Sequence, residues 1–154
     1  MSVFDALTTS FGTAGTGGFG IKNDSIAGYS PYIQYVVTIF MILFGINFSA
    51  YFLLLSKKLR QAIHMEEVRW YLIIIFASIV FISFNARAMF STLEETIRHV
   101  SFQVASVITT TGFATTDFDL WPEFSRTILV ILMFIGYAIY NKRKSIPTKE
   151  RSLQ

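Results

Sequence analysis

Residues 32–55 lie within the longest uncharged stretch of the sequence, and they constrain the fold more than any other feature. As a helix, its 24 residues would be about 36 Å long, enough to cross the roughly 30 Å hydrocarbon core of a bilayer with some tilt. Two further apolar stretches, residues 68–90 and 124–140, have a similar character, although the second of these is short and carries Arg126 near its start. The sequence therefore predicts three transmembrane helices.

The composition supports a membrane class and excludes several others. Only 15% of the 154 residues are charged and 53% are hydrophobic, which is too apolar for a soluble domain of this size. The absence of cysteine excludes a disulfide framework, a cysteine zinc site and a cysteine nucleophile. His64 and His99 have no partner at metal-ligand spacing, and the net charge of +3 does not indicate nucleic acid. We find no acid–base pair or phosphate loop, so an enzyme is not expected.

The charged residues predict how the chain is oriented. Residues 56–69 hold four Lys and Arg and the segment after Tyr140 holds five, whereas residues 85–127 hold three basic and five acidic residues. Basic residues in short loops stay on the cytoplasmic side, so we expect a cytoplasmic loop at 56–69, a basic cytoplasmic tail at 141–154 and a multi-pass protein of the cell membrane. The acidic residues fit either an exposed outer surface or a vestibule that attracts cations.

One structural unit occurs twice. Residues 13–20 read Thr-Ala-Gly-Thr-Gly-Gly-Phe-Gly, and residues 109–116 read Thr-Thr-Thr-Gly-Phe-Ala-Thr-Thr. A proline, Pro31 or Pro122, follows each segment and opens a predicted span, where its missing N–H costs nothing. Fourteen residues after each proline comes a glycine, Gly45 or Gly136. The unit is therefore a short helix, a Thr/Gly segment and a span, repeated after about 91 to 94 residues.

Residues 91–108 precede the second Thr/Gly segment and have the periodicity of a helix. Ser91 and Glu94 have the spacing of a capping box, and apolar residues lie on one helical face: Leu93, Ile97, Val100, Val104, Val107 and Ile108. By itself this segment also fits a helix on the membrane surface. The repeat favours two short pore helices with re-entrant loops, so the predicted fold class is an all-α membrane protein with three spans.

The Thr/Gly segments have the chemistry of a cation filter. A dehydrated alkali cation needs a ring of oxygens, which backbone carbonyls supply when successive residues turn them to one axis. Glycine tolerates the dihedrals this requires, and threonine adds a hydroxyl oxygen. Residues 15–20 also match the glycine spacing of a dinucleotide-binding turn, but that motif needs a strand before it and an acidic residue about 20 positions later. The context favours the filter.

At these residues the sequence resembles the Trk/Ktr superfamily of potassium uptake transporters, whose subunit has four repeats of outer span, pore helix, filter loop and inner span. Residues 1–55 are similar to the second half of the second repeat, and residues 70–140 to the third repeat, with the loop 56–69 between them. The resemblance implies potassium as the transported ion. It also implies filter positions at Thr16, Gly17, Gly18, Phe19, Thr110, Thr111, Gly112 and Phe113.

The same resemblance implies partners: the lipid bilayer, other membrane chains or further copies that close a pore, and a cytosolic nucleotide-binding regulatory subunit. The sequence lacks the family's first and fourth repeats, and after Gly136 it departs from the family's Gly- and Ser-rich intramembrane gate. Two functions therefore stay open. One is potassium transport through a backbone-carbonyl filter, and the other is a non-transporting membrane scaffold or an inactive truncated remnant.

Overall fold

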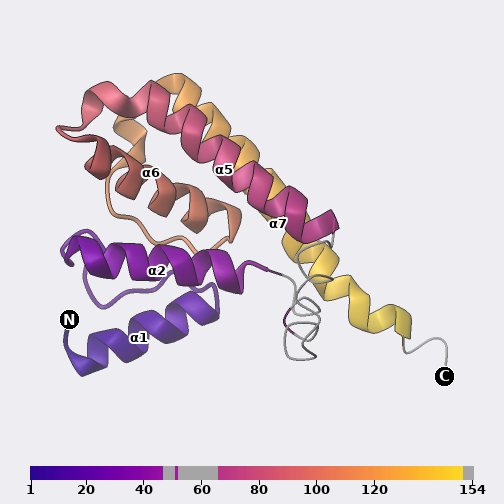
Figure 1. Cartoon of the computed structure of the whole chain (residues 1–154). Helices are drawn as coiled ribbons and strands as arrows, with labels where there is room; N and C mark the ends of the chain where they lie inside the picture. The colour runs from indigo at the N-terminus through magenta and orange to yellow at the C-terminus, as the bar shows by residue number, and fades with distance from the viewer. Residues whose placement is uncertain (47–50, 52–65, 151–154) are drawn as a thin grey trace.

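The computed structural model describes residues 1–46, residue 51 and residues 66–150, with side chains up to residue 141. All regular elements in this part of the chain are helices (Figure 1): α1 (Val3–Ala14), α2 (Pro31–Phe44), α5 (Glu66–Ala86), α6 (Leu93–Ile108) and α7 (Glu123–Glu150), with 3₁₀ turns at Arg87–Met89 and Phe118–Leu120. The predicted all-α class is confirmed for the described residues. A helix rather than a strand precedes residues 15–20, so the dinucleotide interpretation is wrong.

Helices α5 and α7 are long and run antiparallel, side by side (Figure 1). Within the described residues, two helical stretches are long and apolar enough to cross a membrane, Glu66–Met89 and Glu123–Asn141. They correspond to the spans predicted at 68–90 and 124–140. The hydroxyl of Ser125 donates to the side-chain oxygen of Asn85 at 2.8 Å, which joins the end of α5 to the start of α7.

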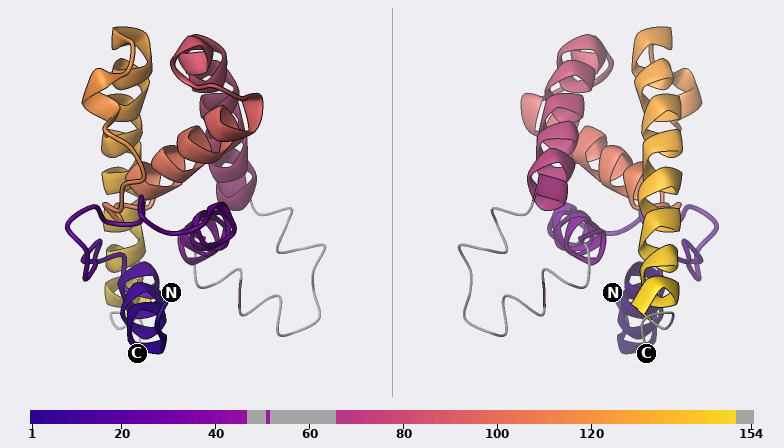
Figure 2. Two further views of the ribbon diagram at one scale, coloured as in Figure 1. Left: turned by 90° about the vertical axis from the view of Figure 1, so that its left-hand side faces the viewer. Right: turned by 90° about the vertical axis from the view of Figure 1, so that its right-hand side faces the viewer.

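Helix α6 crosses obliquely between α5 and α7 and also packs on α2 (Figure 2). Its second half is buried almost all round, since Val100, Phe102 and Val104 have no exposed surface. This burial excludes the alternative of a helix lying on the membrane surface. The predicted apolar face is correct only in part, because Leu93 and Ile97 at its start are exposed.

The capping box of α6 lies one residue later than predicted. Thr92, not Ser91, is the N-cap, and its hydroxyl accepts a hydrogen bond from the N–H of Glu95 at 3.1 Å. The carboxylate of Glu95, not that of Glu94, returns to accept from the N–H of Ser91 at 3.2 Å. Ser and Thr are both good N-caps, so the sequence spacing did not distinguish the two registers.

The first predicted span differs most from the structure. We expected one helix over residues 32–55, but α2 ends at Phe44 after 14 residues, or about 21 Å. In a longer helix the carbonyl of Ile42 would accept from the N–H of Ile46. Instead the hydroxyl of Tyr71 donates to that carbonyl at 3.2 Å, and the N–H of Ile46 turns to Leu43 at 2.8 Å. Residues 47–50 and 52–65, which include most of the predicted cytoplasmic loop and His64, lie outside the described residues.

Two buried clusters hold the helices together. One joins α5, α6 and α7 through residues such as Ile75, Val104 and Leu132. The other joins the segment after α1 to α2 and α6, and its members are Ile26, Val37, Met41, Phe102, Ala105 and Phe113. Both clusters include α6, which therefore forms the centre of the described structure.

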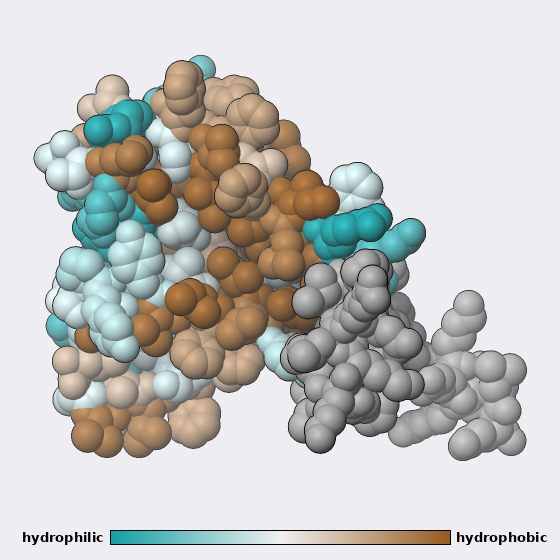
Figure 3. Space-filling view, viewed as in Figure 1, coloured by the Kyte–Doolittle hydropathy of each residue, from teal (hydrophilic) through white to brown (hydrophobic). Residues whose placement is uncertain are grey.

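Much of the outer surface is apolar (Figure 3). Large side chains on the outward faces of α5 and α7 are exposed, including Phe76, Phe81, Phe84 and Phe134. Proteins that remain in water rarely expose contiguous apolar areas of this kind, whereas lipid or further helices would cover them. The surface agrees with the membrane class that the composition predicts.

Candidate functional site

The two Thr/Gly segments leave their helices through equivalent hydrogen bonds. The N–H of Gly17 donates to the carbonyl of Gly12 at 2.8 Å, and 94 positions later the N–H of Thr111 donates to the carbonyl of Ser106 at 2.9 Å. Each segment thus begins at the C-terminus of a helix, α1 or α6. A helix C-terminus carries a partial negative charge, which favours a cation beside it.

The backbone of both segments enters the left-handed region at equivalent positions. Thr16 and Gly18 have φ angles of 48° and 67°, and Thr110 and Gly112, each 94 positions later, have 57° and 87°. Glycine adopts such angles freely, but a β-branched threonine is strained there, by about 1–3 kcal/mol. The alternation is the same in both units, and it includes a strained residue in both, so the repeat seen in the sequence is also a repeat of backbone conformation.

This conformation turns successive carbonyls to one side. In a trans peptide the C=O and the following N–H point in opposite directions, and the described part of the chain has no cis peptide. The N–H groups of Thr111 and Gly112 both point to the carbonyl of Ser106, at 2.9 and 3.4 Å. The carbonyls of Thr110 and Thr111 therefore point away from α6. Adjacent carbonyls on one side are what coordination of a dehydrated cation requires.

The two segments lie against each other. A side chain at Gly18 would overlap the carbonyl oxygen of Thr111, and its β-carbon would lie 3.3 Å from the carbonyl carbon of Gly112. At Gly112, the equivalent position, a β-carbon would meet nothing within 4 Å. The first segment thus packs on the second, while the matching face of the second segment has no neighbour among the described residues.

The phenylalanines of the two segments occupy different surroundings. Phe113 is 1% exposed and packs in the cluster between α2 and α6, whereas Phe19 is 82% exposed. The threonine hydroxyls are also not all free to face an ion, because the Oγ1 atoms of Thr111 and Thr109 lie 2.7 Å apart and share a hydrogen bond. All eight predicted filter residues lie in the two segments, and Gly18 of the first lies directly against Thr111 and Gly112 of the second.

Comparison with known proteins assigns the family. The family model described as "TrkH: Cation transport protein" matches residues 1–140. The chain belongs to the TrkH family of cation transport proteins. This confirms the resemblance that the repeated segments indicated.

Curated relatives of this TrkH-family chain are named as potassium uptake proteins. The chain is 34% identical over 140 residues to the Trk system potassium uptake protein TrkH of Escherichia coli K12, covering 88% of this chain and 29% of that protein. It is 29% identical over 142 residues to TrkG of the same organism, covering 90% and 29%. The chain therefore spans less than a third of the length of these relatives.

A solved structure has the same fold. The crystal structure of the potassium transporter TrkH from Vibrio parahaemolyticus superposes with a TM-score of 0.80 at 25% sequence identity. The match covers 86% of this chain and 30% of the other. The arrangement of α1, α2, α5, α6 and α7 is thus that of one part of a TrkH transporter.

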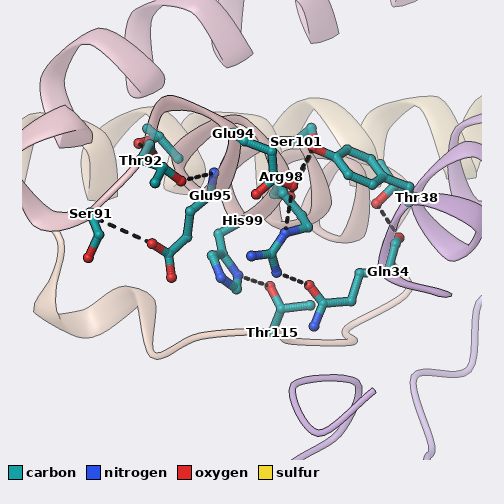
Figure 4. Close-up of polar contacts among 12 residues, drawn as sticks. Gln34, Thr38, Ser91, Thr92, Glu94, Glu95, Arg98, His99, Ser101 and Thr115 are labelled. Carbon is teal, nitrogen blue, oxygen red and sulfur yellow. Dashed lines mark hydrogen bonds and ion pairs between the residues drawn. The ribbon is translucent and has the colours of Figure 1, made fainter. Parts of the chain in front are cut away.

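In this TrkH-family chain, polar contacts fix α6 to its surroundings (Figure 4). Arg98 donates to the side-chain oxygen of Gln34 on α2 at 2.5 Å and pairs with Glu94 at 3.0 Å. Near the end of the second segment, the Oγ1 of Thr115 lies 2.9 Å from the Nδ1 of His99. These contacts tie α6 both to α2 and to the chain that leaves the second segment.

His99 is half-buried and is expected to be neutral in the fold. Burial, followed by the positive charge of Arg98, lowers the pKa of its imidazole below the ordinary value of 6.5, and the carboxylates of Glu95 and Glu94 oppose this only in part. The ring also stacks on Phe90, with 5.4 Å between ring centroids. A neutral imidazole can donate to or accept from Thr115, whereas a protonated one can only donate.

Two glycines let other helices approach the end of α6. A β-carbon at Gly136 in α7 would lie 2.5 Å from the carbonyl oxygen of Ile108, and one at Gly45 would overlap the hydroxyl of Tyr71 and lie 2.7 Å from Thr109. The sequence placed both glycines at equivalent points of the repeat. Both glycines therefore permit close contacts between helices.

Sequence reasoning missed the residues that hold the second segment from outside. Ser106 in α6 donates to the carbonyl of Phe113 at 2.6 Å, and Ser25 accepts from the N–H of Ala114 at 3.1 Å. Thr115 and His99 were also missed as a pair. Only Ser106 carried a usable signal, since it is a small polar residue on a helix that is otherwise apolar near its end.

Proposed function

We propose that this chain supplies two neighbouring segments of a potassium pathway in a Trk-type uptake protein of the cell membrane. The observation that carries the proposal is the repeated backbone, in which a strained threonine and a glycine two positions later have positive φ in both segments. Residues strained in this way cluster at functional sites. Here it turns carbonyls of Thr110 and Thr111 to one side, where they would replace the hydration shell of a potassium ion.

The pathway needs more than these two segments. The open face at Gly112, compared with the occupied face at Gly18, supports a further segment of the same kind beside the second one. The rest would come from other parts of a longer chain, from further copies or from partner membrane chains. In the proposed arrangement, three spans and two re-entrant loops lie in the bilayer, and a cytosolic nucleotide-binding subunit regulates the assembly.

Potassium is proposed as the ion because the curated relatives are named as potassium uptake proteins. The filter residues in this proposal are those named from the sequence: Thr16, Gly17, Gly18, Phe19, Thr110, Thr111, Gly112 and Phe113. Backbone carbonyls such as those of Thr110 and Thr111, rather than charged side chains, would bind the ion. The alternative is a membrane scaffold or inactive remnant that carries no ions.

Growth at low potassium separates these functions. Cells that lack their own potassium uptake systems would express this chain, or the variants Gly18→Ser and Gly112→Ser. The matched control is Gly20→Ala, because a β-carbon there has no neighbour closer than 3.9 Å and its φ angle is ordinary. Rescue by the wild type and by Gly20→Ala, with loss in both serine variants, is the expected result.

One other outcome would contradict the proposal: if all four chains rescue growth equally, the two segments do not form the pathway. If none rescues growth although insertion into the membrane is verified, this chain does not transport potassium by itself. It is then either a scaffold or remnant, or one piece of a split transporter. Uptake of rubidium ions into vesicles that contain the purified chain would repeat the comparison without the cell.

A further inference from the structure

Two serine hydroxyls hold opposite ends of one peptide group in the second segment. The hydroxyl of Ser106 donates to the carbonyl of Phe113 at 2.6 Å, and the N–H of Ala114 donates to the hydroxyl of Ser25 at 3.1 Å. Because a peptide group is planar, fixing its oxygen and its N–H together fixes the rotation of the whole group. Ser106 and Phe113 are each 1% exposed, so water does not compete for the first bond.

The fixed peptide points opposite to the peptides of Thr110 and Thr111. The N–H groups of Thr111 and Gly112 point to α6, so the carbonyls of Thr110 and Thr111 point away from it. The carbonyl of Phe113 instead points back into α6, toward Ser106. Fixing this peptide therefore keeps its carbonyl off the side that the carbonyls of Thr110 and Thr111 face.

The first segment lacks this arrangement. Gly12 stands 94 positions before Ser106 and has no hydroxyl to donate. The carbonyl oxygen of Phe19 lies only 3.2 Å from the place where a β-carbon of residue 12 would be, so the geometry is similar and only the donor is missing. The two segments share one backbone conformation but differ in how firmly their last carbonyl is held.

We propose that Ser106 and Ser25 are positioning residues that keep the Phe113 carbonyl out of the ion path and thereby sharpen the choice between potassium and sodium. This inference rests on the proposed function. Without either hydroxyl, a buried carbonyl or N–H loses its partner, which is unfavourable, and rotation of the peptide relieves it. Rotation brings an additional oxygen to the ion side, and selectivity depends on the number and field of such oxygens.

The first test measures the peptide and needs no ion flux. Hydrogen–deuterium exchange of the purified chain, in detergent, would follow the amide of Ala114 in the wild type and in Ser106→Ala. Loss of the Ser106 bond is expected to accelerate this exchange by about five- to tenfold. The control is Ser101→Ala on the same helix, since the hydroxyl of Ser101 donates only to a carbonyl of that helix, that of Arg98 at 3.1 Å.

Ser25→Ala provides a second variant at a half-buried turn position, in case loss of the buried Ser106 hydroxyl prevents folding. It removes the acceptor of the Ala114 N–H directly, so exchange at Ala114 is expected to rise at least as much. Exchange within twofold of the wild type in both variants would overturn the inference, because the peptide would then be held by something else.

The second test measures ion choice. Vesicles containing the chain would be loaded with potassium or sodium, and the ratio of rubidium to sodium uptake compared between the wild type, Ser106→Ala and Ser101→Ala. A ratio at least threefold lower in Ser106→Ala, with Ser101→Ala unchanged, is expected. An unchanged ratio in a conducting Ser106→Ala variant overturns the selectivity role while the proposed function stands. If the wild type conducts no ions, both the proposed function and the selectivity role of Ser106 are wrong. Faster exchange at Ala114 in the variants would then show that the two serines only stabilise the structure of the segment.

Discussion

The contact between α7 and the end of α6 can be tested by a single methyl group at Gly136. A β-carbon there would lie 2.5 Å from the carbonyl oxygen of Ile108 and 3.0 Å from its carbonyl carbon. An ordinary contact needs about 3.4 Å, so the end of α6 or the whole of α7 would have to move by roughly 0.9 Å. The atoms in the way are backbone, so no side chain can rotate to make room.

Whether Gly136→Ala stabilises or destabilises the fold decides if α7 approaches α6 this closely. In an unobstructed helix, replacing glycine by alanine stabilises by about 1 kcal/mol. Overpacking against backbone costs about 2–3 kcal/mol, so Gly136→Ala is expected to destabilise by a net of about 1–2 kcal/mol. For a chain of this length that lowers the unfolding midpoint by about 2–8 °C.

Thermal unfolding in detergent measures this midpoint, with Ala138→Ser as the control at an exposed position of the same helix. Hydrogen–deuterium exchange adds a local readout, because movement of Ile108 would loosen the bonds of Thr110 and Thr111 that begin the second segment. A midpoint that is unchanged or higher in Gly136→Ala would refute the close approach, since the helix would then show only the gain from alanine.

Two further predictions concern α6. Because the pKa of His99 is lowered in the fold, the unfolded chain binds a proton at this residue more readily than the folded chain. The contribution of His99 to stability is therefore complete above about pH 6.5 and is lost as the pH falls through the lowered pKa. His99→Gln should flatten the pH dependence of the unfolding midpoint between about pH 7.5 and pH 5.5, and an equally steep curve in the variant would contradict this. Thr92→Ala removes the N-cap hydroxyl that accepts from the N–H of Glu95. It should lower the free energy of unfolding by about 1 kcal/mol and the unfolding midpoint by about 2–4 °C. Ser91→Ala keeps its backbone N–H and should change stability little; equal losses in the two variants would show that Thr92 is not the N-cap.

The sequence predicted the helices where apolar length and turn chemistry act locally. The spans at 68–90 and 124–140 and the helix before the second segment follow from runs of apolar residues and from caps. The apolar helical stretches lie within a few residues of the predicted ends, although α7 itself continues to Glu150. The early end of α2 did not follow, because it depends on Tyr71, which is 29 residues away in sequence and takes the Ile42 carbonyl. A contact between distant segments leaves no local signal.

The candidate site was predicted from its repeat, and the repeat explains which of its features could be foreseen and which could not. Thr/Gly segments at equal spacing located the eight residues, because similar sequences after similar helices adopt similar backbones. What differs between the two copies could not be foreseen. Gly12 and Ser106 occupy equivalent positions, but only the folded chain shows that a hydroxyl at this position reaches the carbonyl seven residues later.

The placement of threonine at the strained positions gives a further reason to regard the segments as functional. A glycine at Thr16 or Thr110 would remove the strain of a positive φ, as Gly18 and Gly112 do two positions later. Threonine in this conformation costs about 1–3 kcal/mol, so stability alone favours glycine at both places. On the proposed function, the threonine side chain would contribute something that the fold by itself does not need. A hydroxyl oxygen or a methyl group beside a line of carbonyls would do so, by adding an oxygen or by limiting the width of the path.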